Sequence, residues 1–285
     1  MRIAGAPISW GVCEVPGWGY QLTPGRVLSE MAGVGIVATE FGPDGFLPDD
    51  PEQKAATLAS YGLKAVGGFV PVVLHDAGHD PVPEVDRALD SFVAAGGDVL
   101  VLAANSGMDG YDARPVLDEQ GWATMFANLD RLAALARSRG VTPSLHPHVG
   151  TMVETKDDVL RVLTGSSIPL CLDTGHLLIG GTDPVEIVRQ WTDRIAHVHV
   201  KDVDSGLVAK VQAGELTYQQ AVAQSLYVPL GKGDVDFAAI VASLTKAGYD
   251  GWYVMEQDTI LAEEPQGEGP LGAVRESIAY LKGLA

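Results

Sequence analysis

The sequence predicts a single α/β domain in which eight strands and eight helices close into a (β/α)8 TIM barrel. Eight short apolar segments alternate with helical segments over 285 residues, and about 250 residues are typical of this fold. Apolar residues make up 46% of the chain, which is enough for one large core. Closure removes exposed sheet edges, and no G-x-G-x-x-G motif follows the first strand to favour an open, doubly wound sheet.

The strand–helix–strand unit between residues 168 and 202 is the clearest part of this pattern. Its apolar runs, 168–172 and 195–200, flank a helix that begins at Asp183 and Pro184. An Asp accepts the free amide hydrogens of a helix start, and a Pro at the first helical position has no amide hydrogen to leave unpaired. So short a connection between two strands requires that they pair in parallel.

Polar residues lie at the carboxyl ends of both strands of this unit, where α/β proteins place their chemistry. Side chains alternate along a strand, so Cys171 and Asp173 share one face of the first strand. His197, His199 and Lys201 share one face of the second. If both faces point inward, Asp173 and His199 converge at one rim, and together they form half of a divalent-metal site.

The other elements are placed by the same pattern and by Gly and Pro at their ends. We expect strands at 2–9, 36–41, 63–70, 98–103, 141–146, 168–172, 195–200 and 251–256. We expect helices at 24–32, 51–60, 82–95, 121–139, 156–164, from 184, at 237–247 and at 269–284. The helix at 121–139 carries a core-facing stripe at helical spacing, formed by Trp122, Met125, Phe126, Leu129 and Leu132.

The domain organisation follows from the absence of any low-complexity linker. Residues 1–285 are expected to form one TIM-barrel domain. A segment rich in Gln and Ala at about 204–227 is expected to be a helical insertion between strands seven and eight, with its helix around 217–226.

Composition and charge exclude several classes of protein. The formal net charge of −18 argues against binding nucleic acid, which is a polyanion. No run of about 18 apolar residues occurs, so no membrane span is expected. The first ten residues indicate a strand and not a signal peptide, and two cysteines indicate no disulfide framework. These features favour a cytoplasmic protein with a small-molecule substrate; a homo-oligomer is compatible with them.

Most of the seven histidines lie at or just beyond expected strand ends, whereas random placement would put several on helices. Neutral imidazole together with carboxylate suits Mn²⁺, Co²⁺, Zn²⁺ or Fe²⁺. Without a thiolate in the set, a structural zinc site is not expected. The residues at the expected rim are Glu40, His75, Asn105, His146, His148, Asp173, His176, His199, Lys201 and Glu256.

Four motifs in order along the chain resemble the xylose isomerase-like TIM barrel superfamily of sugar phosphate isomerases and epimerases. They are DTGH at 173–176, HVHVKD at 197–202, GKGDVDF at 231–237 and GWYVMEQD at 251–258. Two further motifs, PISWG at 7–11 and LHPHVGT at 145–151, are most similar to the inosose dehydratase branch.

This resemblance implies a divalent metal held by Glu, Asp, His and Glu from strands five to eight. Asp173, His199 and Glu256 match the last three positions, whereas the first Glu falls on His146. Either His146 or His148 then stands as the fourth ligand, and we take His146. We expect one ion, with Mn²⁺ or Co²⁺ favoured over Zn²⁺ or Mg²⁺.

Catalytic and substrate-binding roles are assigned to other residues near the expected rim. Glu256, His148, Lys201 and His176 are the candidates for proton transfer, and Glu40, Trp10 and Asn105 are the candidates for substrate contact. Each has a structural alternative. Asp173 can cap the following turn, Glu256 can form an ion pair with Lys201, and Trp10 can simply close the barrel.

The expected chemistry starts from a ketone and its neighbouring hydroxyl on a divalent ion, which makes the C–H between them more acidic. Two symmetrical ligand glutamates suit reversible epimerisation, and His146 breaks that symmetry. The first interpretation is therefore a metal-dependent lyase that dehydrates a keto-sugar or inosose, as in inositol catabolism. The alternative is a ketose isomerase or epimerase on the same site. A metallonuclease is disfavoured by the acidic charge, and a sugar-binding barrel without a metal is the non-catalytic alternative.

Overall fold

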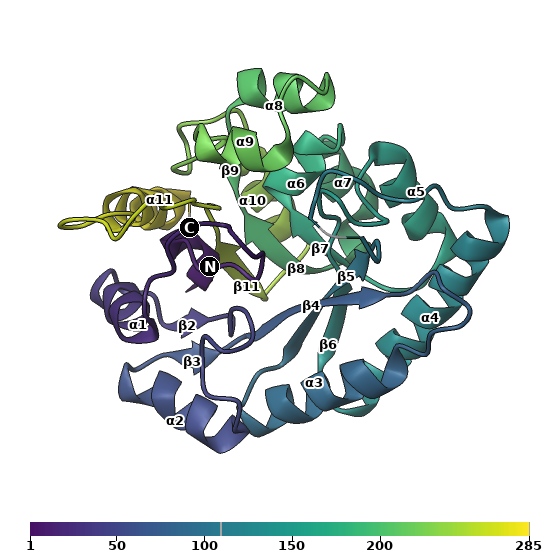
Figure 1. The fold of residues 1–285 in the computed structure, drawn as a ribbon, viewed down its shortest axis with the longest axis horizontal. Helices are drawn as coiled ribbons and strands as arrows, with labels where there is room; N and C mark the ends of the chain where they lie inside the picture. Colours follow the sequence, from purple (N-terminus) through teal and green to yellow (C-terminus); the bar gives the residue numbers. More distant parts are fainter. Residues whose placement is uncertain (109, 285) are drawn as a thin grey trace.

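The computed structural model describes residues 1–108 and 110–284, and its main sheet curls into a nearly closed parallel barrel (Figure 1). The order around the barrel is β3-β2-β1-β11-β8-β7-β6-β5-β4, which confirms the predicted TIM-barrel fold. The strands are β1 (Arg2–Gly5), β2 (Ala38–Thr39), β3 (Lys64–Ala65), β4 (Gly67–Val73), β5 (Val99–Asn105), β6 (Thr142–Leu145), β7 (Leu170–Asp173), β8 (Ile195–Val200) and β11 (Trp252–Met255).

The third expected strand, 63–70, is broken into β3 and β4, which pair with different neighbours. The break falls at Gly67, whose φ of 149° is accessible to glycine and strained for other residues. A Cβ at Gly67 would lie 1.8 Å from the carbonyl oxygen of Val99, so a larger residue would clash with the neighbouring backbone. β3 pairs with β2 and β4 pairs with β5, so the ring of strands continues through this divided strand.

The first two strands are shorter than expected. Strand β1 ends at Gly5, and residues Pro7–Trp10 form a 3-10 helix where the sequence predicted strand. Pro7 has no amide hydrogen to donate to a neighbouring strand, which explains the early end of the ladder. Strand β2 is only two residues long, although the amide of Glu40 still donates to the carbonyl of Gly5 at 3.0 Å.

Helices surround the barrel at the expected places (Figure 1). Among the helices that the sequence predicted around the barrel, five are capped by an Asp or Thr side chain that accepts a backbone amide hydrogen: Asp50, Asp118, Thr155, Asp183 and Asp236. One short helix, α6, was not predicted; it begins directly after Asp173. The bounds are α1 (Pro24–Gly33), α2 (Pro51–Ser60), α3 (Val82–Ala94), α4 (Glu119–Ser138), α5 (Lys156–Gly165), α6 (Thr174–Ile179), α7 (Pro184–Trp191), α10 (Phe237–Lys246) and α11 (Leu271–Leu284).

The segment at 204–227 contains two helices, α8 (Ser205–Gln212) and α9 (Tyr218–Ala223), where the sequence indicated one around 217–226. Asp204 caps α8, and Ser225, with a φ of 67°, lies just beyond the end of α9. The short strands β9 (Asp202–Val203) and β10 (Tyr227–Val228) pair in antiparallel fashion at the base of this segment. Figure 1 shows α8 and α9 beside α6, outside the ring of strands.

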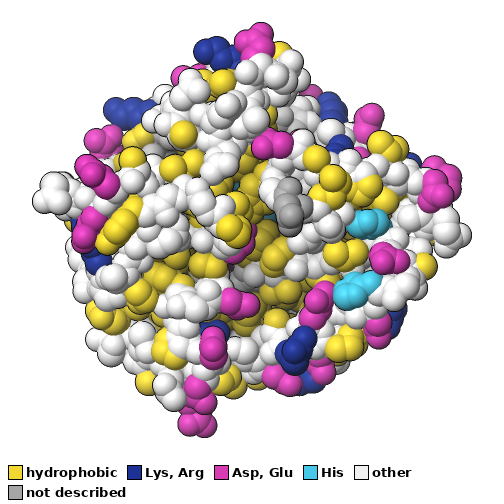
Figure 2. Space-filling model, in the orientation of Figure 1, with side chains coloured by type: hydrophobic (Ala, Val, Ile, Leu, Met, Phe, Trp, Pro, Cys, Tyr) yellow, Lys and Arg dark blue, Asp and Glu magenta, His cyan; other side chains and the backbone are white. Residues whose placement is uncertain are grey.

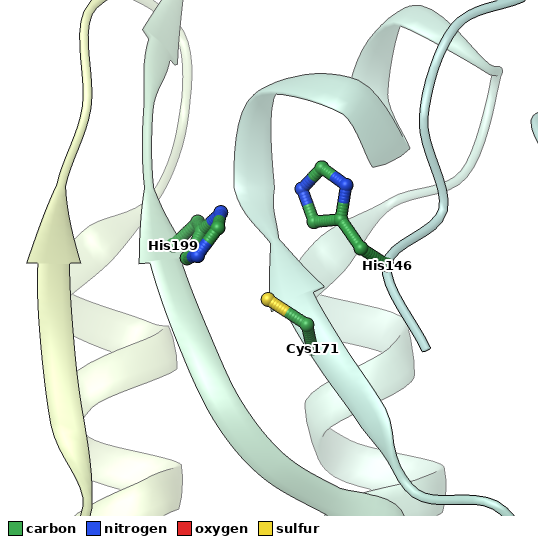
Figure 3. A group of neighbouring side chains, drawn as sticks. All are labelled: His146, Cys171 and His199. Carbon is green, nitrogen blue, oxygen red and sulfur yellow. The ribbon is translucent and has the colours of Figure 1, made fainter. Parts of the chain in front are cut away.

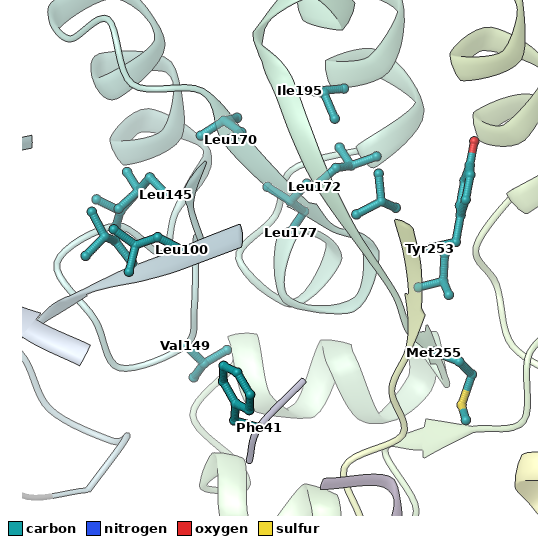
Figure 4. Close-up of a cluster of buried hydrophobic side chains, with 14 of the residues drawn as sticks. Phe41, Leu100, Leu145, Val149, Leu170, Leu172, Leu177, Ile195, Tyr253 and Met255 are labelled. Atoms are coloured by element: carbon teal, nitrogen blue, oxygen red, sulfur yellow. The ribbon is translucent and has the colours of Figure 1, made fainter. Parts of the chain in front are cut away.

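Two apolar clusters explain why the polar residues gather at one end of the barrel. The larger cluster fills the space between the strands and the helices and includes Leu100, Leu145, Leu170 and Leu172 (Figure 4). The smaller cluster consists mainly of inward-facing strand residues: Ala4, Ala6, Ala38, Val66, Val99, Val101, Cys171, Trp252 and Val254.

In the described part of the chain, no helix is both long and apolar enough to cross a membrane.

Candidate active site

Asp173, His199 and Glu256 lie together at the carboxyl ends of neighbouring strands. Asp173 ends β7 and pairs in register with His199 of β8, and Glu256 follows directly after β11. All three side chains are buried, and each offers one ligand atom within 4.8 Å of the other two. Asp173, His199 and Glu256 are called the donor group below. The predicted convergence of Asp173 and His199 at one rim is therefore present in the structure.

The His199 Nδ1 atom has the surroundings of a metal-binding nitrogen. It lies 3.0 Å from Glu256 Oε2 and 3.5 Å from Asp173 Oδ2. It is nevertheless buried without a well-oriented hydrogen bond from any residue in the described part of the chain. A nitrogen and two carboxylate oxygens facing a common point suit a divalent ion such as Mn²⁺, Co²⁺ or Zn²⁺. The residues present thus fit the metal that the sequence predicted.

Asp173 also caps helix α6, so both interpretations of this residue apply at once. Its Oδ1 accepts the amide hydrogen of His176 at 2.8 Å, while Oδ2 faces Nδ1 of His199. Burial alone would raise the pKa of Asp173, but Lys201 and His176 hold the pKa well below its usual value. The carboxylate is therefore ionised and held in one orientation.

Lys201 is a buried ammonium among three carboxylates. Its Nζ lies 2.7 Å from Asp258 Oδ1, 3.2 Å from Glu256 Oε2 and 3.7 Å from Asp173 Oδ2. Burial alone would lower the pKa of Lys201, but Asp258, Glu256 and Asp173 raise the pKa well above its ordinary value. The ion pair with Glu256 that the sequence suggested as a structural alternative is thus present beside the donor group.

His146 is not part of the donor group, although it lies next to Asp173. Its Nε2 lies 3.0 Å from Asp173 Oδ2, and burial lowers the pKa of His146 to about 4, so the ring is neutral. Figure 3 shows Cys171 on β7 between His146 and His199, and these three residues form a second possible donor set. Burial raises the pKa of the Cys171 thiol to about 11, so the sulfur carries its proton and is a poor ligand.

His148 and His176 form a pair of stacked, buried rings next to Lys201. Their centroids are 3.8 Å apart, and Lys201 Nζ lies 3.1 Å from His176 Nε2. Burial lowers the pKa of both rings, so both are neutral near pH 7. His148 Nδ1 donates to the carbonyl oxygen of Val149 at 2.7 Å, because a carbonyl only accepts. The other nitrogen of His148 therefore carries a lone pair.

The three predicted substrate contacts are placed differently from one another. Glu40 is buried inside the barrel and accepts hydrogen bonds from His197 and His199. Trp10 is fully buried in the core, and its indole nitrogen donates to Glu30 of α1, so it has the structural role given above as the alternative to substrate contact. Asn105 accepts the amide hydrogen of Gly107 at 2.7 Å and stabilises its own turn.

Sequence reasoning missed several polar residues of this region. Asp258 lies two residues after Glu256 in a quoted motif, so strand alternation was a usable signal. The Tyr218 hydroxyl donates to Asp258 Oδ2 at 2.8 Å and lies 2.9 Å from the Tyr227 hydroxyl. No sequence signal places Tyr218 there, because the path of the 204–227 segment depends on tertiary packing. Glu14 accepts from the Tyr111 hydroxyl at 2.6 Å.

A cavity of about 1060 Å³ opens above the donor group. Figure 2 shows the molecule hollowed near the centre of this face, with hydrophobic side chains in the hollow and acidic side chains around it. The polar residues near the donor group that line the cavity are Glu14, Glu40, Tyr111, His146, His148, His199, Lys201, Glu256 and Asp258. A polyol-sized molecule therefore has room beside the donors and the neutral His148 ring.

Comparison with known proteins agrees with this geometry. A family model described as xylose isomerase-like TIM barrel matches residues 31–284. The chain belongs to this family. It is 32% identical over 275 residues to an inosose dehydratase of Geobacillus kaustophilus (strain HTA426), a match that covers 90% of this chain and 87% of that protein.

Solved structures with the same fold are more distant in sequence. The chain is similar to the IOLI protein with a bound zinc atom, with a TM-score of 0.72, 15% identity and coverage of 100% of this chain and 98% of that one. It is also similar to the D-allulose 3-epimerase of a Methylomonas species in complex with D-allulose, with a TM-score of 0.69, 19% identity and coverage of 100% and 97%. At these identities the similarity concerns the fold.

The set of Asp173, His199 and Glu256 and the set of His146, Cys171 and His199 make opposite predictions for Asp173 and Cys171. We expect Asp173→Asn to weaken Zn²⁺ or Co²⁺ binding by at least about 100-fold, because loss of a ligand should exceed the loss of a supporting hydrogen bond. We expect Cys171→Ser to bind the ion as tightly as the unaltered protein. Isothermal titration calorimetry with the purified variants measures both metal affinities. Retention of tight binding in Asp173→Asn together with its loss in Cys171→Ser would assign the metal to the thiol set.

Metal affinity should also depend on pH through His199. Burial alone would lower the pKa of His199, but the carboxylates of Glu256 and Glu40 hold that pKa well above its ordinary value. The ring is then protonated at neutral pH, and an entering cation displaces that proton. We expect the apparent Kd for Zn²⁺ to rise about tenfold for each unit of pH lowered between about 8 and 5.5. Affinity that is independent of pH in a chelator-competition assay would indicate carboxylate ligands alone.

Proposed function

We propose that this protein is a divalent-metal-dependent lyase that removes water from an inosose or a related keto-polyol. Two features support the proposal: the buried donor group beside a large cavity, and the 32% identity to an inosose dehydratase over nearly the whole chain. The orientation of His148 carries most weight, because it leaves one neutral imidazole nitrogen free as a base beside that group.

Asp173, His199 and Glu256 would hold the ion, with His146 next to Asp173 as the fourth ligand or as its hydrogen-bond partner. A divalent cation bound there polarises a ketone and its neighbouring hydroxyl and makes the C–H bond between them more acidic. Mn²⁺, Co²⁺ and Zn²⁺ all suit this mixture of nitrogen and oxygen donors.

His148 is assigned the role of general base. Its Nδ1 is engaged with Val149, so Nε2 has the lone pair, and the ring lines the cavity. Burial keeps the ring neutral at pH 7 by lowering its pKa. In this proposal, Nε2 accepts the proton from the carbon next to the ketone.

Lys201 is assigned the role of general acid. Its raised pKa keeps the ammonium charged, and the ammonium lines the cavity beside Glu256. His176 Nε2 lies 3.1 Å from this ammonium and accepts from it, so that nitrogen has no proton to give. Lys201 then donates a proton to the hydroxyl on the following carbon.

The two proton transfers together amount to dehydration. One C–H bond and one C–O bond break, a C=C bond forms, and the hydroxyl leaves as water. Epimerisation needs a base on each face of the carbon, and the family position that would supply a second carboxylate is His146 in this chain. A ketose isomerase or epimerase therefore remains the alternative that the product must exclude.

Substitution of the two proton-transfer residues tests these assignments. We expect His148→Gln and Lys201→Met each to lower kcat for dehydration of an inosose by about 10²- to 10⁴-fold, measured with each variant saturated with metal. The matched control is His79→Gln, because His79 lies on the surface against Glu84. A His148→Gln enzyme with the rate of the unaltered protein would remove His148 from the mechanism.

A further inference from the structure

Beneath the donor group, the carboxylate of Glu40 is hydrogen-bonded to both histidines of strand β8. Glu40 Oε1 lies 2.9 Å from His197 Nε2 and 2.9 Å from His199 Nε2. The three side chains are at most 3% exposed. Glu40 follows the end of β2, which is separated from β8 by β1 and β11 in the sheet order, so its side chain reaches these rings across the barrel interior.

The hydrogen bonds decide which nitrogen of His199 faces the donor group. A carboxylate oxygen only accepts, so both Nε2 atoms must carry a hydrogen and donate it to Glu40. The lone pair of a neutral His199 ring is then on Nδ1, the atom beside Glu256 Oε2 and Asp173 Oδ2. With the opposite tautomer, Nε2 would place a second lone pair against the carboxylate, and Nδ1 would present a hydrogen to any cation.

We propose that Glu40 is a positioning residue for metal binding: it fixes the tautomer and the ring orientation of His199 so that Nδ1 serves as a ligand. This inference rests on the metal site of the proposed function. A histidine ligand commonly donates its other ring hydrogen to a carboxylate, which also raises the basicity of the ligand nitrogen. Glu40, expected from sequence to contact substrate, has the position for this task.

The residues around Glu40 hold its backbone and its carboxylate in one position. Its amide donates to the carbonyl of Gly5 at 3.0 Å, and the Thr39 hydroxyl donates to its carbonyl at 2.8 Å, so the backbone is held on both sides. The carboxylate is ionised, because the two imidazoles lower its pKa although burial alone would raise it. His197 Nε2 donates to the same oxygen and restricts the carboxylate further.

The same three residues, Glu40, His197 and His199, also have ligand atoms within 4.8 Å of one another. A second ion bound among them would make Glu40 a ligand and not a positioning residue. The two hydrogen bonds already satisfy the facing atoms without such an ion. Metal stoichiometry therefore separates the two roles.

The test is a set of Zn²⁺ titrations with a competing chelator. Glu40→Leu removes the acceptor, and we expect its Kd for Zn²⁺ to rise by about 10- to 100-fold. Glu40→Gln keeps a carbonyl acceptor of the same shape, and we expect a smaller loss than in Glu40→Leu. Glu14→Gln is the matched control: it removes a negative charge from the same cavity without a hydrogen bond to a donor residue, and its Kd should stay within about twofold.

A second measurement reports the tautomer directly. In Zn²⁺-loaded protein labelled with ¹⁵N, His199 should give a protected Nε2–H signal, and this protection should be lost in Glu40→Leu. Equal Zn²⁺ affinity in the unaltered protein, Glu40→Gln and Glu40→Leu would overturn the inference, as would two ions per chain in the unaltered protein. Absence of Zn²⁺ binding in the unaltered protein would reject the metal site together with this inference. Metal binding without dehydration would reject only the reaction.

Discussion

The surplus of negative charge at the mouth of the barrel is the constraint on which the site depends. Asp173, Glu256 and Asp258 are buried within reach of one ammonium, that of Lys201, and Glu40 lies just below. Buried charges are costly unless they are paired and hydrogen-bonded. Lys201 and a protonated His199 offset part of this charge, and a divalent ion would offset more. The negative charge that remains on these carboxylates therefore favours a cation beside His199.

The alternation of side chains along strands places this charge where it is useful. Inward positions of the strands carry small apolar residues such as Ala4, Val99 and Val254; Glu256 takes the next inward position after Val254, and His199 pairs with Val254 on the neighbouring strand. The apolar layer excludes water from one side of the polar layer and strengthens its electrostatic interactions. The segments after the strands then add His148, Asp258 and Tyr218 around the open side.

The periodicity of the sequence was sufficient to predict the barrel, because apolar strands and amphipathic helices depend on local patterns. It also brought Asp173 and His199 together, since register and alternation constrain neighbouring parallel strands. The break at Gly67 was not predictable, because it depends on the close approach of Val99. The contact of Glu40 with His199 spans 159 positions of sequence and crosses the barrel interior, so a pattern along one strand could not indicate it. Trp10 was misplaced because the 3-10 helix at Pro7–Trp10 turns its side chain into the core.

In the proposed reaction the site commits its substrate to loss of water, because His148 acts as base without the second base that epimerisation needs. Metal-loaded protein incubated with a panel of inososes and ketoses in deuterium oxide distinguishes the two reactions. We expect an absorbing enone or diketone product from an inosose, and recovered substrate with little deuterium next to the ketone. Reversible interconversion of two sugars, with deuterium incorporated and no absorbing product, would contradict it and identify an isomerase or epimerase.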